Sequence, residues 1–262
     1  MDFTGKTVLV TGASSGIGRE SAIRFARGGA DLALVARRKD VLDAAASSLE
    51  SRYGVRAKAY QCDVSKREQV SRMTRLALDE FSGIDVLVNN AGFAISGAVS
   101  ALSVEDIESQ MQTNYFGMVY CTKGLLPHML ERGSGHIVNV ASVAASFGLP
   151  GIAPYCASKS AMLGFSEGLK HELRGTGVGV TVVSPIMVRT EFFDHPCFEN
   201  VPRSPAASLG PGAAAKAVLQ AAGSPRLEII VPPPVRAAVW LKHTFPFVMN
   251  PILGRAFRRY MR

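Results

Sequence analysis

The chain has 262 residues, of which 47% are hydrophobic and 19% are charged, so it can build a large core and is not an intrinsically disordered protein. Its formal net charge is +8, but seven Lys/Arg and one acidic residue after position 225 contribute +6, which leaves about +2 for the first 225 residues. A nearly neutral body is not a general nucleic-acid-binding surface, and no nucleic-acid partner is expected.

Cysteine and histidine patterns restrict the chemistry further. The four cysteines form no CxxC pair, and the five histidines are scattered without metal-ligand spacing. This predicts reduced, packed thiols and no metal in the site. The first residues show no signal peptide, so a cytoplasmic location is expected.

Short apolar runs alternate with helical patterns along the chain. Strands are predicted at residues 7–10, 32–35, 57–62, 86–88, 136–140, 180–183 and 228–231. Helices are predicted at residues 19–27, 41–51, 67–81, 104–131 and 157–173. Apolar strands separated by helices indicate a parallel sheet buried on both faces, so we expect a Rossmann-like, doubly wound α/β fold with seven strands. No linker divides it, which predicts one domain over 1–231 and a C-terminal extension over 232–262.

A glycine-rich turn, TGASSGIG at 11–18, lies between the first predicted strand and the first predicted helix. Glycines let the backbone approach a pyrophosphate, which the free N–H groups of the helix N-terminus can bind. In this position the turn predicts a dinucleotide site. The residues expected to contact the cofactor there are Gly12, Ser14, Ser15, Gly16, Ile17 and Gly18.

The end of the second predicted strand bears on the choice of cofactor. NAD sites usually carry an acid here, which binds the ribose 2′-hydroxyl, but this chain has Ala36 followed by Arg37 and Arg38. A guanidinium can bind a 2′-phosphate through charge-assisted bonds. The alternative is that both arginines belong to a solvated loop, but the missing acid favours NADP(H).

Three side chains suggest acid–base chemistry. Tyr155 and Lys159 are four residues apart and therefore share one face of a predicted helix. A cation beside a tyrosine favours the phenolate and lowers the tyrosine pKa. Ser142 ends the preceding strand, where its hydroxyl could donate to a substrate carbonyl. A YxxxK pair alone is also found on ordinary helix surfaces.

With these motifs in order, the sequence resembles the short-chain dehydrogenase/reductase family from residue 5 to about 231. Asp63 and Val64 match the family's adenine contact, NNAG at 89–92 matches a motif beside the cofactor cleft, and Ser142 precedes Tyr155 by the family's 13-residue interval. The resemblance implies further cofactor contacts at Asn89, Ala91, Gly92, Tyr155, Lys159, Pro185, Val188 and Thr190.

The resemblance also implies roles for four catalytic residues. Tyr155 exchanges a proton with the substrate, while Lys159 lowers the Tyr155 pKa and binds the nicotinamide ribose. Ser142 orients the carbonyl, and Asn114 holds a water that connects Lys159 to solvent.

One segment departs from the family pattern. The family usually reads Pro-Gly after the sixth strand, whereas here Pro185 is followed by Ile186. A β-branched residue avoids positive φ and adds bulk near the nicotinamide. Either the backbone there is ordinary, or the substrate pocket is reshaped.

The segments after the sixth strand bear on the substrate and on partners. Residues 191–210 contain Phe192, Phe193 and Phe198, and they either cover a hydrophobic substrate or close the core.

The extension over 232–262 has too few consecutive apolar residues to span a bilayer. Over 253–262 an apolar face and an arginine face suit a peripheral helix on an anionic membrane, and packing on a neighbouring subunit is the alternative.

These patterns together predict an NADP(H)-dependent oxidoreductase that transfers a hydride between the nicotinamide and a carbonyl or alcohol of a hydrophobic substrate. The helices at 104–131 and 157–173 match those of family dimer interfaces, so the resemblance implies a homodimer or homotetramer. Two alternatives are a non-catalytic NADP(H)-binding regulator and a membrane-recruited scaffold. A regulator would be free to lose Tyr155 or Lys159, and both are present.

Overall fold

The computed structural model of the chain describes residues 1–194, 196–198 and 208–257. Seven parallel strands form one sheet in the order β3-β2-β1-β4-β5-β6-β7. The strands are β1 (Thr7–Thr11), β2 (Asp31–Ala36), β3 (Ala57–Gln61), β4 (Val86–Asn89), β5 (Gly135–Val140), β6 (Val178–Pro185) and β7 (Glu228–Val231). The strand order reverses between β1 and β4, where doubly wound sheets bind ligands. The predicted parallel α/β fold is confirmed.

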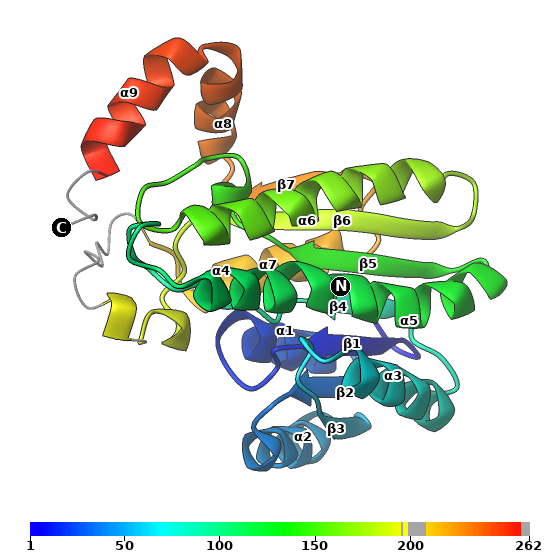
Figure 1. Ribbon diagram of the computed structural model, residues 1–262. Coiled ribbons are helices and arrows are strands. Elements are labelled where there is room, and N and C mark those ends of the chain that lie inside the picture. The colour runs from blue at the N-terminus through cyan, green and yellow to red at the C-terminus, as the bar shows by residue number, and fades with distance from the viewer. Residues whose placement is uncertain (195, 199–207, 258–262) are drawn as a thin grey trace.

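Helices cover both faces of this sheet (Figure 1). One face packs against α1 (Gly16–Arg27), α2 (Lys39–Tyr53) and α7 (Pro211–Ala221). The other packs against α3 (Arg67–Phe81), α5 (Gly117–Glu131) and α6 (Ala153–Glu172), with α4 (Val104–Met111) beside α6. Nearly all residues of the central strands are buried, which explains why their sequences are mostly apolar.

Helix α7 is absent from the sequence-based expectations. Its sequence is rich in alanine, the strongest helix former, and Pro211 stands in the first turn, where a missing N–H costs little. The buried face consists almost entirely of alanine, and this small surface lets α7 pack closely on α1. The alanine run and the first-turn proline were the available signals.

The long helix predicted over 104–131 is continuous but not uniform. A π-helical turn, η1 (Gln112–Phe116), separates α4 from α5. Such turns insert one extra residue into a helix and often occur at functional sites. This one contains Asn114, which is completely buried.

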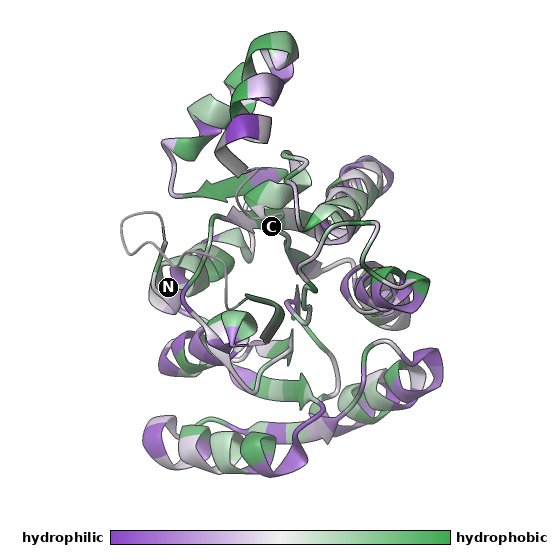
Figure 2. Cartoon of the chain, turned by 60° about the vertical axis from the view of Figure 1, so that its left-hand side comes forward, coloured by the Kyte–Doolittle hydropathy of each residue, from purple (hydrophilic) through white to green (hydrophobic). Residues whose placement is uncertain are grey.

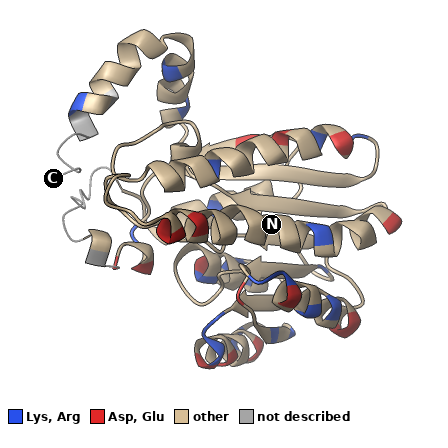
Figure 3. Cartoon of the chain, viewed as in Figure 1, with Lys and Arg blue, Asp and Glu red and all other residues tan. Residues whose placement is uncertain are grey.

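The C-terminal extension forms two helices, α8 (Val235–Thr244) and α9 (Pro246–Phe257), which pack against each other. The hairpin projects from the body of the molecule (Figure 2), and its charged residues are basic (Figure 3). Pro246 begins α9, and Pro251 lies inside it. The amphipathic pattern predicted over 253–262 lies largely outside the described residues.

Candidate active site

A cavity of about 490 Å³ opens at the carboxyl edge of the sheet. It runs from the turn after β1, past the ends of β2 and β4, to the segments after β5 and β6. Its walls therefore come from loops that are far apart in sequence. A parallel sheet brings these loops together because all its strands end at the same edge.

The glycine-rich turn lies unusually close to its neighbours. Gly12 has φ +66°, in the left-handed region. A Cβ at Gly18 would collide with the carbonyl oxygen of Gly12 and with the side-chain nitrogen of Asn90. The Asn90 Nδ2 donates to the carbonyl oxygens of Thr11 and Gly12 at 3.0 and 3.3 Å. These contacts hold the N-terminus of α1 at the cavity, where its free N–H groups suit a phosphate.

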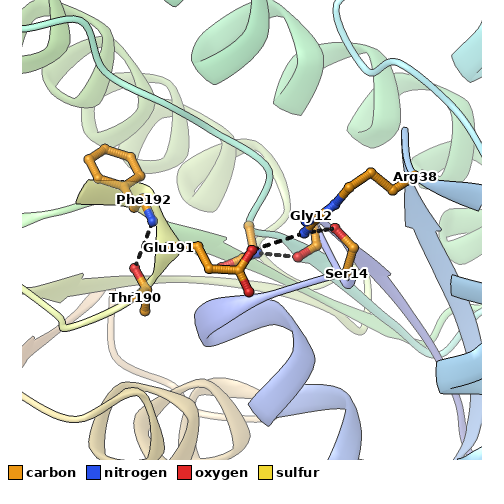
Figure 4. Close-up of polar contacts among 7 residues, drawn as sticks. Gly12, Ser14, Arg38, Thr190, Glu191 and Phe192 are labelled. Carbon is orange, nitrogen blue, oxygen red and sulfur yellow. Dashed lines mark hydrogen bonds and ion pairs between the residues drawn. The ribbon is translucent and has the colours of Figure 1, made fainter. Parts of the chain in front are cut away.

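Arg38 crosses from the end of β2 to this turn (Figure 4). Its guanidinium donates to the Ser14 hydroxyl at 3.1 Å and pairs with the Glu191 carboxylate at 3.2 Å. Arg37 also lines the cavity, and its backbone carbonyl accepts a hydrogen bond from the Gln61 side chain at 3.1 Å. The two arginines predicted to act together therefore lie in different environments.

Ser142, Tyr155 and Lys159 meet in the wall beyond the turn. Ser142 precedes a short 3-10 helix, η2 (Val143–Ala145), and its Oγ accepts from the Ala144 N–H at 3.1 Å. Ser142 and Tyr155 are joined by a side-chain hydrogen bond. The Lys159 ammonium lies 5.7 Å from the Tyr155 ring centre and donates to the Val140 carbonyl at 2.9 Å.

Burial dominates the electrostatics of this pair. It raises the pKa of Tyr155, against the effect of the Ser142 hydrogen bond. It also lowers the pKa of Lys159 from 10.5 to about 7, because the side chain is almost completely buried.

Asn114 lies behind the cavity wall. Its side-chain amide donates to the Phe93 carbonyl and accepts from the Phe93 N–H, both at 2.9 Å. A Cβ at Gly92 would lie 2.9 Å from the Asn114 oxygen and 3.5 Å from the Lys159 nitrogen. The glycine therefore leaves room for Asn114 and Lys159 to approach each other.

The segment after β6 shows whether Ile186, which stands where the family usually has glycine, strains the backbone. Within the described residues, Ser82 alone among non-glycines has a positive φ, so the Ile186 backbone is ordinary. Its N–H donates to the Val231 carbonyl at 2.9 Å, and the residue lines the cavity. Isoleucine thus fits without backbone strain and adds apolar surface to the wall. Thr190, four residues later, lies close to Gly16, where an added Cβ would be only 3.1 Å from the Thr190 side chain.

Three phenylalanines close the cavity beside Tyr155. Phe192 lies in η3 (Glu191–Phe193), with its ring centre 5.7 Å from that of Tyr155. Phe193 and Phe198, which belongs to η4 (Pro196–Phe198), pack on Phe192 at 5.0 and 5.8 Å between ring centres. All three line the cavity. They form an apolar wall where a substrate would meet Tyr155.

This ordered set of loops matches a known family. The short chain dehydrogenase family model matches residues 6–196. The chain belongs to the short-chain dehydrogenase family. Its relatives are named dehydrogenases and reductases, so the protein is an oxidoreductase of this family.

Curated relatives differ in their named substrates. Human 17-beta-hydroxysteroid dehydrogenase 13 is 37% identical over 73% of this chain, and the match covers 65% of that enzyme. Ketoacyl reductase HetN from Nostoc sp. is 36% identical over 87% of this chain and 79% of its own length. The NADP-dependent 3-hydroxy acid dehydrogenase of Schizosaccharomyces pombe is 37% identical, covering 72% of this chain and 73% of that enzyme.

Solved short-chain dehydrogenases share the whole fold. The Sphingobium yanoikuyae enzyme in complex with NADPH superposes with a TM-score of 0.82 at 33% identity, covering 94% of this chain and 95% of its own. A Burkholderia phymatum short-chain dehydrogenase/reductase in complex with NAD gives 0.84 at 28% identity, covering 95% and 96%. The fold alone therefore accommodates either nicotinamide cofactor.

The residues that the sequence analysis assigned to this short-chain dehydrogenase site surround the cavity, with three exceptions. Gly18 packs beneath the turn and Asn114 behind the wall, as described above. Asn89 is buried in the sheet, where its side chain donates to Asn139 at 2.9 Å. Successive strand residues point to opposite faces, so Asn90 makes the contact with the turn instead.

Some cavity residues had no sequence signal for a site. Val140, Ala141 and Val143 flank Ser142 and simply continue an apolar strand in the sequence. Leu149 and Ile152 come from the loop before α6, and Glu191 from the start of η3. Proximity to a recognised residue was the available clue for the first three. Nothing in the local pattern distinguished Leu149 and Ile152, whereas Glu191 begins the segment 191–210 that was expected to cover the substrate or close the core.

We expect the buried lysine to make stability depend on pH in the cofactor-free protein. The folded state releases the Lys159 proton near pH 7, whereas an unfolded lysine keeps it to about pH 10.4. The unfolded state therefore binds more protons between these values, and the free energy of unfolding should rise by about 1 kcal/mol per pH unit there. Urea unfolding at pH 7.5 and 8.5 should show this rise for wild type and a flatter response for Lys159→Met. Equal slopes would contradict it.

Proposed function

We propose that the protein is an NADP(H)-dependent oxidoreductase that transfers a hydride between the nicotinamide and a carbonyl or alcohol of a hydrophobic substrate. The observation that carries this proposal is the cluster of Ser142, Tyr155 and Lys159 in a cavity that continues to the glycine turn. The turn fits a dinucleotide because Gly12 and Gly18 let it lie close to Asn90, which holds the free N–H groups of α1 at the cavity. When bound, the nicotinamide supplies or accepts the hydride.

The chain's own residues would then manage the proton and the geometry. Tyr155 holds the proton that passes to or from the substrate oxygen, and Ser142 orients that oxygen through its hydroxyl. Lys159, when protonated, favours the Tyr155 phenolate and can bind the ribose hydroxyls. Asn114, which is held behind the wall by Phe93 and Ser158, would hold a water that connects Lys159 to solvent.

Arg38 favours NADP(H) over NAD(H). Its guanidinium lies at the glycine turn, held by Ser14 and Glu191, at the end of a strand that carries no acid after Ala36. This is where the ribose 2′-substituent lies in such folds, and a guanidinium binds a phosphate well. The relative from Schizosaccharomyces pombe is named NADP-dependent, and the Sphingobium enzyme was solved with NADPH.

The apolar wall supports a hydrophobic substrate. Phe192, Phe193 and Ile186 line the cavity near Tyr155. Relatives are named for steroid, ketoacyl and 3-hydroxy acid substrates, all of which present a hydroxyl or carbonyl on a carbon skeleton. We assign the chain to substrates of this general kind.

A homodimer or homotetramer is part of the proposal. Phe116, which is 39% exposed, stacks on Tyr120 along the run from η1 into α5. This helical run corresponds to the one through which family members assemble. Light scattering during gel filtration measures the subunit number directly.

Tyr155→Phe should abolish turnover without abolishing cofactor binding. Loss of the acid–base group lowers kcat by roughly 10²- to 10⁴-fold, because the hydroxyl that exchanges the proton is gone. NADPH consumption with a panel of hydrophobic ketones, aldehydes and quinones measures the rate, and NADPH fluorescence measures binding. Tyr53→Phe is the matched control, since the Tyr53 hydroxyl is buried in α2 without a hydrogen-bond partner in the described residues. Equal rates in wild type and Tyr155→Phe would refute the proton-transfer role, and NADPH binding without turnover in wild type would favour a regulator.

Arg38→Ala should weaken NADPH binding far more than Arg37→Ala does. A lost charge-assisted bond of about 1.5–3 kcal/mol corresponds to roughly 10- to 100-fold in Kd. NADH binding should hardly change in either variant, since it has no 2′-phosphate. Titration of both cofactors against both variants makes the comparison. Equal losses for NADPH and NADH would mean that Arg38 only supports the fold of the turn.

Glu191→Gln should tighten NADPH binding. The Glu191 carboxylate occupies the Arg38 guanidinium that the 2′-phosphate would use, and its negative charge opposes a phosphate. Both side chains are half-exposed, so the competing pair contributes about 0.2–1 kcal/mol, or up to about fivefold in Kd. The gain should shrink at high salt and be absent for NADH. An equal gain for both cofactors would argue against competition at the phosphate.

A further inference from the structure

The α8–α9 hairpin is the part of the molecule that the catalytic fold does not explain. It follows β7 and projects from the body on the side where the strands end (Figures 1 and 2). All ten residues of α8 are described, and none is buried. The hairpin therefore adds almost nothing to the core, and most of its surface is left uncovered by the rest of the chain.

Large apolar side chains gather where the two helices meet. Trp240, Phe245 and Phe247 form a continuous aromatic row, with ring centres 6.3 and 6.2 Å apart along it. Trp240 is 62% exposed and Phe247 is 73% exposed. Val248 and Ile252 extend this exposed apolar surface along α9. Contiguous apolar surface of this kind usually marks a contact with another body.

The charges around this surface are of one sign. From Ile229 to the end the sequence contains Lys and Arg residues but no Asp or Glu. Arg236 and Arg255 are exposed and Lys242 is half-exposed, so the hairpin carries positive charge beside the aromatic row (Figure 3). Tryptophan and phenylalanine next to basic residues are typical of segments that lie in the interface of an anionic bilayer.

Two other roles fit the hairpin less well than contact with an anionic bilayer: a membrane-spanning segment and a contact with a second copy of the chain. No helix in the described ranges is long and apolar enough to cross a membrane, so a surface contact is the available mode. A two-fold contact between the hairpins of two copies would bring the same positive groups face to face. Attraction to acidic lipid headgroups avoids that repulsion.

We propose that the α8–α9 hairpin docks the protein on anionic lipid bilayers, with its aromatic row in the headgroup region and its basic residues on the acidic headgroups. The cavity opens at the same edge of the sheet. If the proposed oxidoreductase function holds, docking presents the cavity mouth to the membrane in which an apolar carbonyl or alcohol would dissolve.

Vesicle flotation of the full chain tests the docking. Vesicles of phosphatidylcholine with phosphatidylglycerol should carry the protein upward at low salt, and vesicles of phosphatidylcholine alone should do so far less. Phe247→Ser should weaken binding about tenfold, because its exposed ring no longer enters the interface. The double change Arg236→Glu with Lys242→Glu should weaken it at least tenfold, and high salt should act in the same direction.

Matched changes on α3 separate a local contact from a general effect of composition. Leu76 is an exposed apolar residue there, and Arg72 and Arg75 are exposed basic residues. Leu76→Ser and the double change Arg72→Glu with Arg75→Glu should leave flotation unchanged. Equal losses from the α3 and hairpin variants would overturn the proposal, as would the absence of flotation in wild type.

The alternative that the hairpin binds a second copy of the chain can be tested separately. Light scattering of Phe247→Ser should give the wild-type subunit number, and dissociation into smaller species without any vesicle binding would assign the hairpin to a subunit interface instead. NADPH oxidation with a water-soluble ketone should be the same in the hairpin variants and wild type. A protein that floats but shows no turnover would refute the oxidoreductase proposal and leave the docking intact.

Discussion

The closeness of helix α1 to the ends of β1 and β4 is the constraint on which the site depends. Asn90 bonds to two carbonyl oxygens of the turn, and the backbone N–H groups of Asn90 and Ala91 both donate to the Thr11 hydroxyl at 3.0 Å. Gly18 is needed because any side chain there would strike the turn. These contacts fix the free end of α1 at the point where the strand order reverses, and every other wall of the cavity is arranged around it.

A second constraint is that Tyr155 and Lys159, the groups proposed to react, lie in a poorly solvated wall. Burial raises the pKa of Tyr155 and lowers that of Lys159, so both groups tend to be neutral before anything binds. The lysine stays in place through the Val140 carbonyl at the end of β5, and Asn114 and Gly92 approach it from the other side. The geometry is therefore formed in advance, while the protonation states remain free to respond to a bound ligand.

Much of the fold was predictable because its signals are local and repeated. Short, largely apolar runs mark the strands, of which the central ones are buried on both faces. The glycine turn, Ser142 and the Tyr155–Lys159 pair stand directly after strands or on one helix face. Helix α7 was missed because a face made of alanine leaves no hydrophobic periodicity. The π-helical turn at Asn114 was missed because one inserted residue changes the backbone geometry without changing the composition.

Contacts between distant loops were the least predictable part of the site. No local pattern shows that Glu191 will meet Arg38, because 153 residues separate them and the sheet alone brings them together. The same holds for Phe192 against Tyr155. Residues with a recognisable motif could be named from the sequence, whereas those that shape the cavity could be named only once the strand ends were in place.

The position of each segment in the sheet separates the candidate active site from the segments that surround it. The family match ends at residue 196, and it includes the turn, the cluster of Ser142, Tyr155 and Lys159, and the start of the aromatic wall. Phe198, α7, β7 and the α8–α9 hairpin lie beyond it. Because β6 and β7 both end at the edge that carries the cavity, segments that follow them can change the substrate wall or the docking surface without disturbing the glycine turn. The groups proposed for the chemistry thus lie at the centre of the sheet, and the surfaces proposed for substrate and membrane lie where its last two strands end.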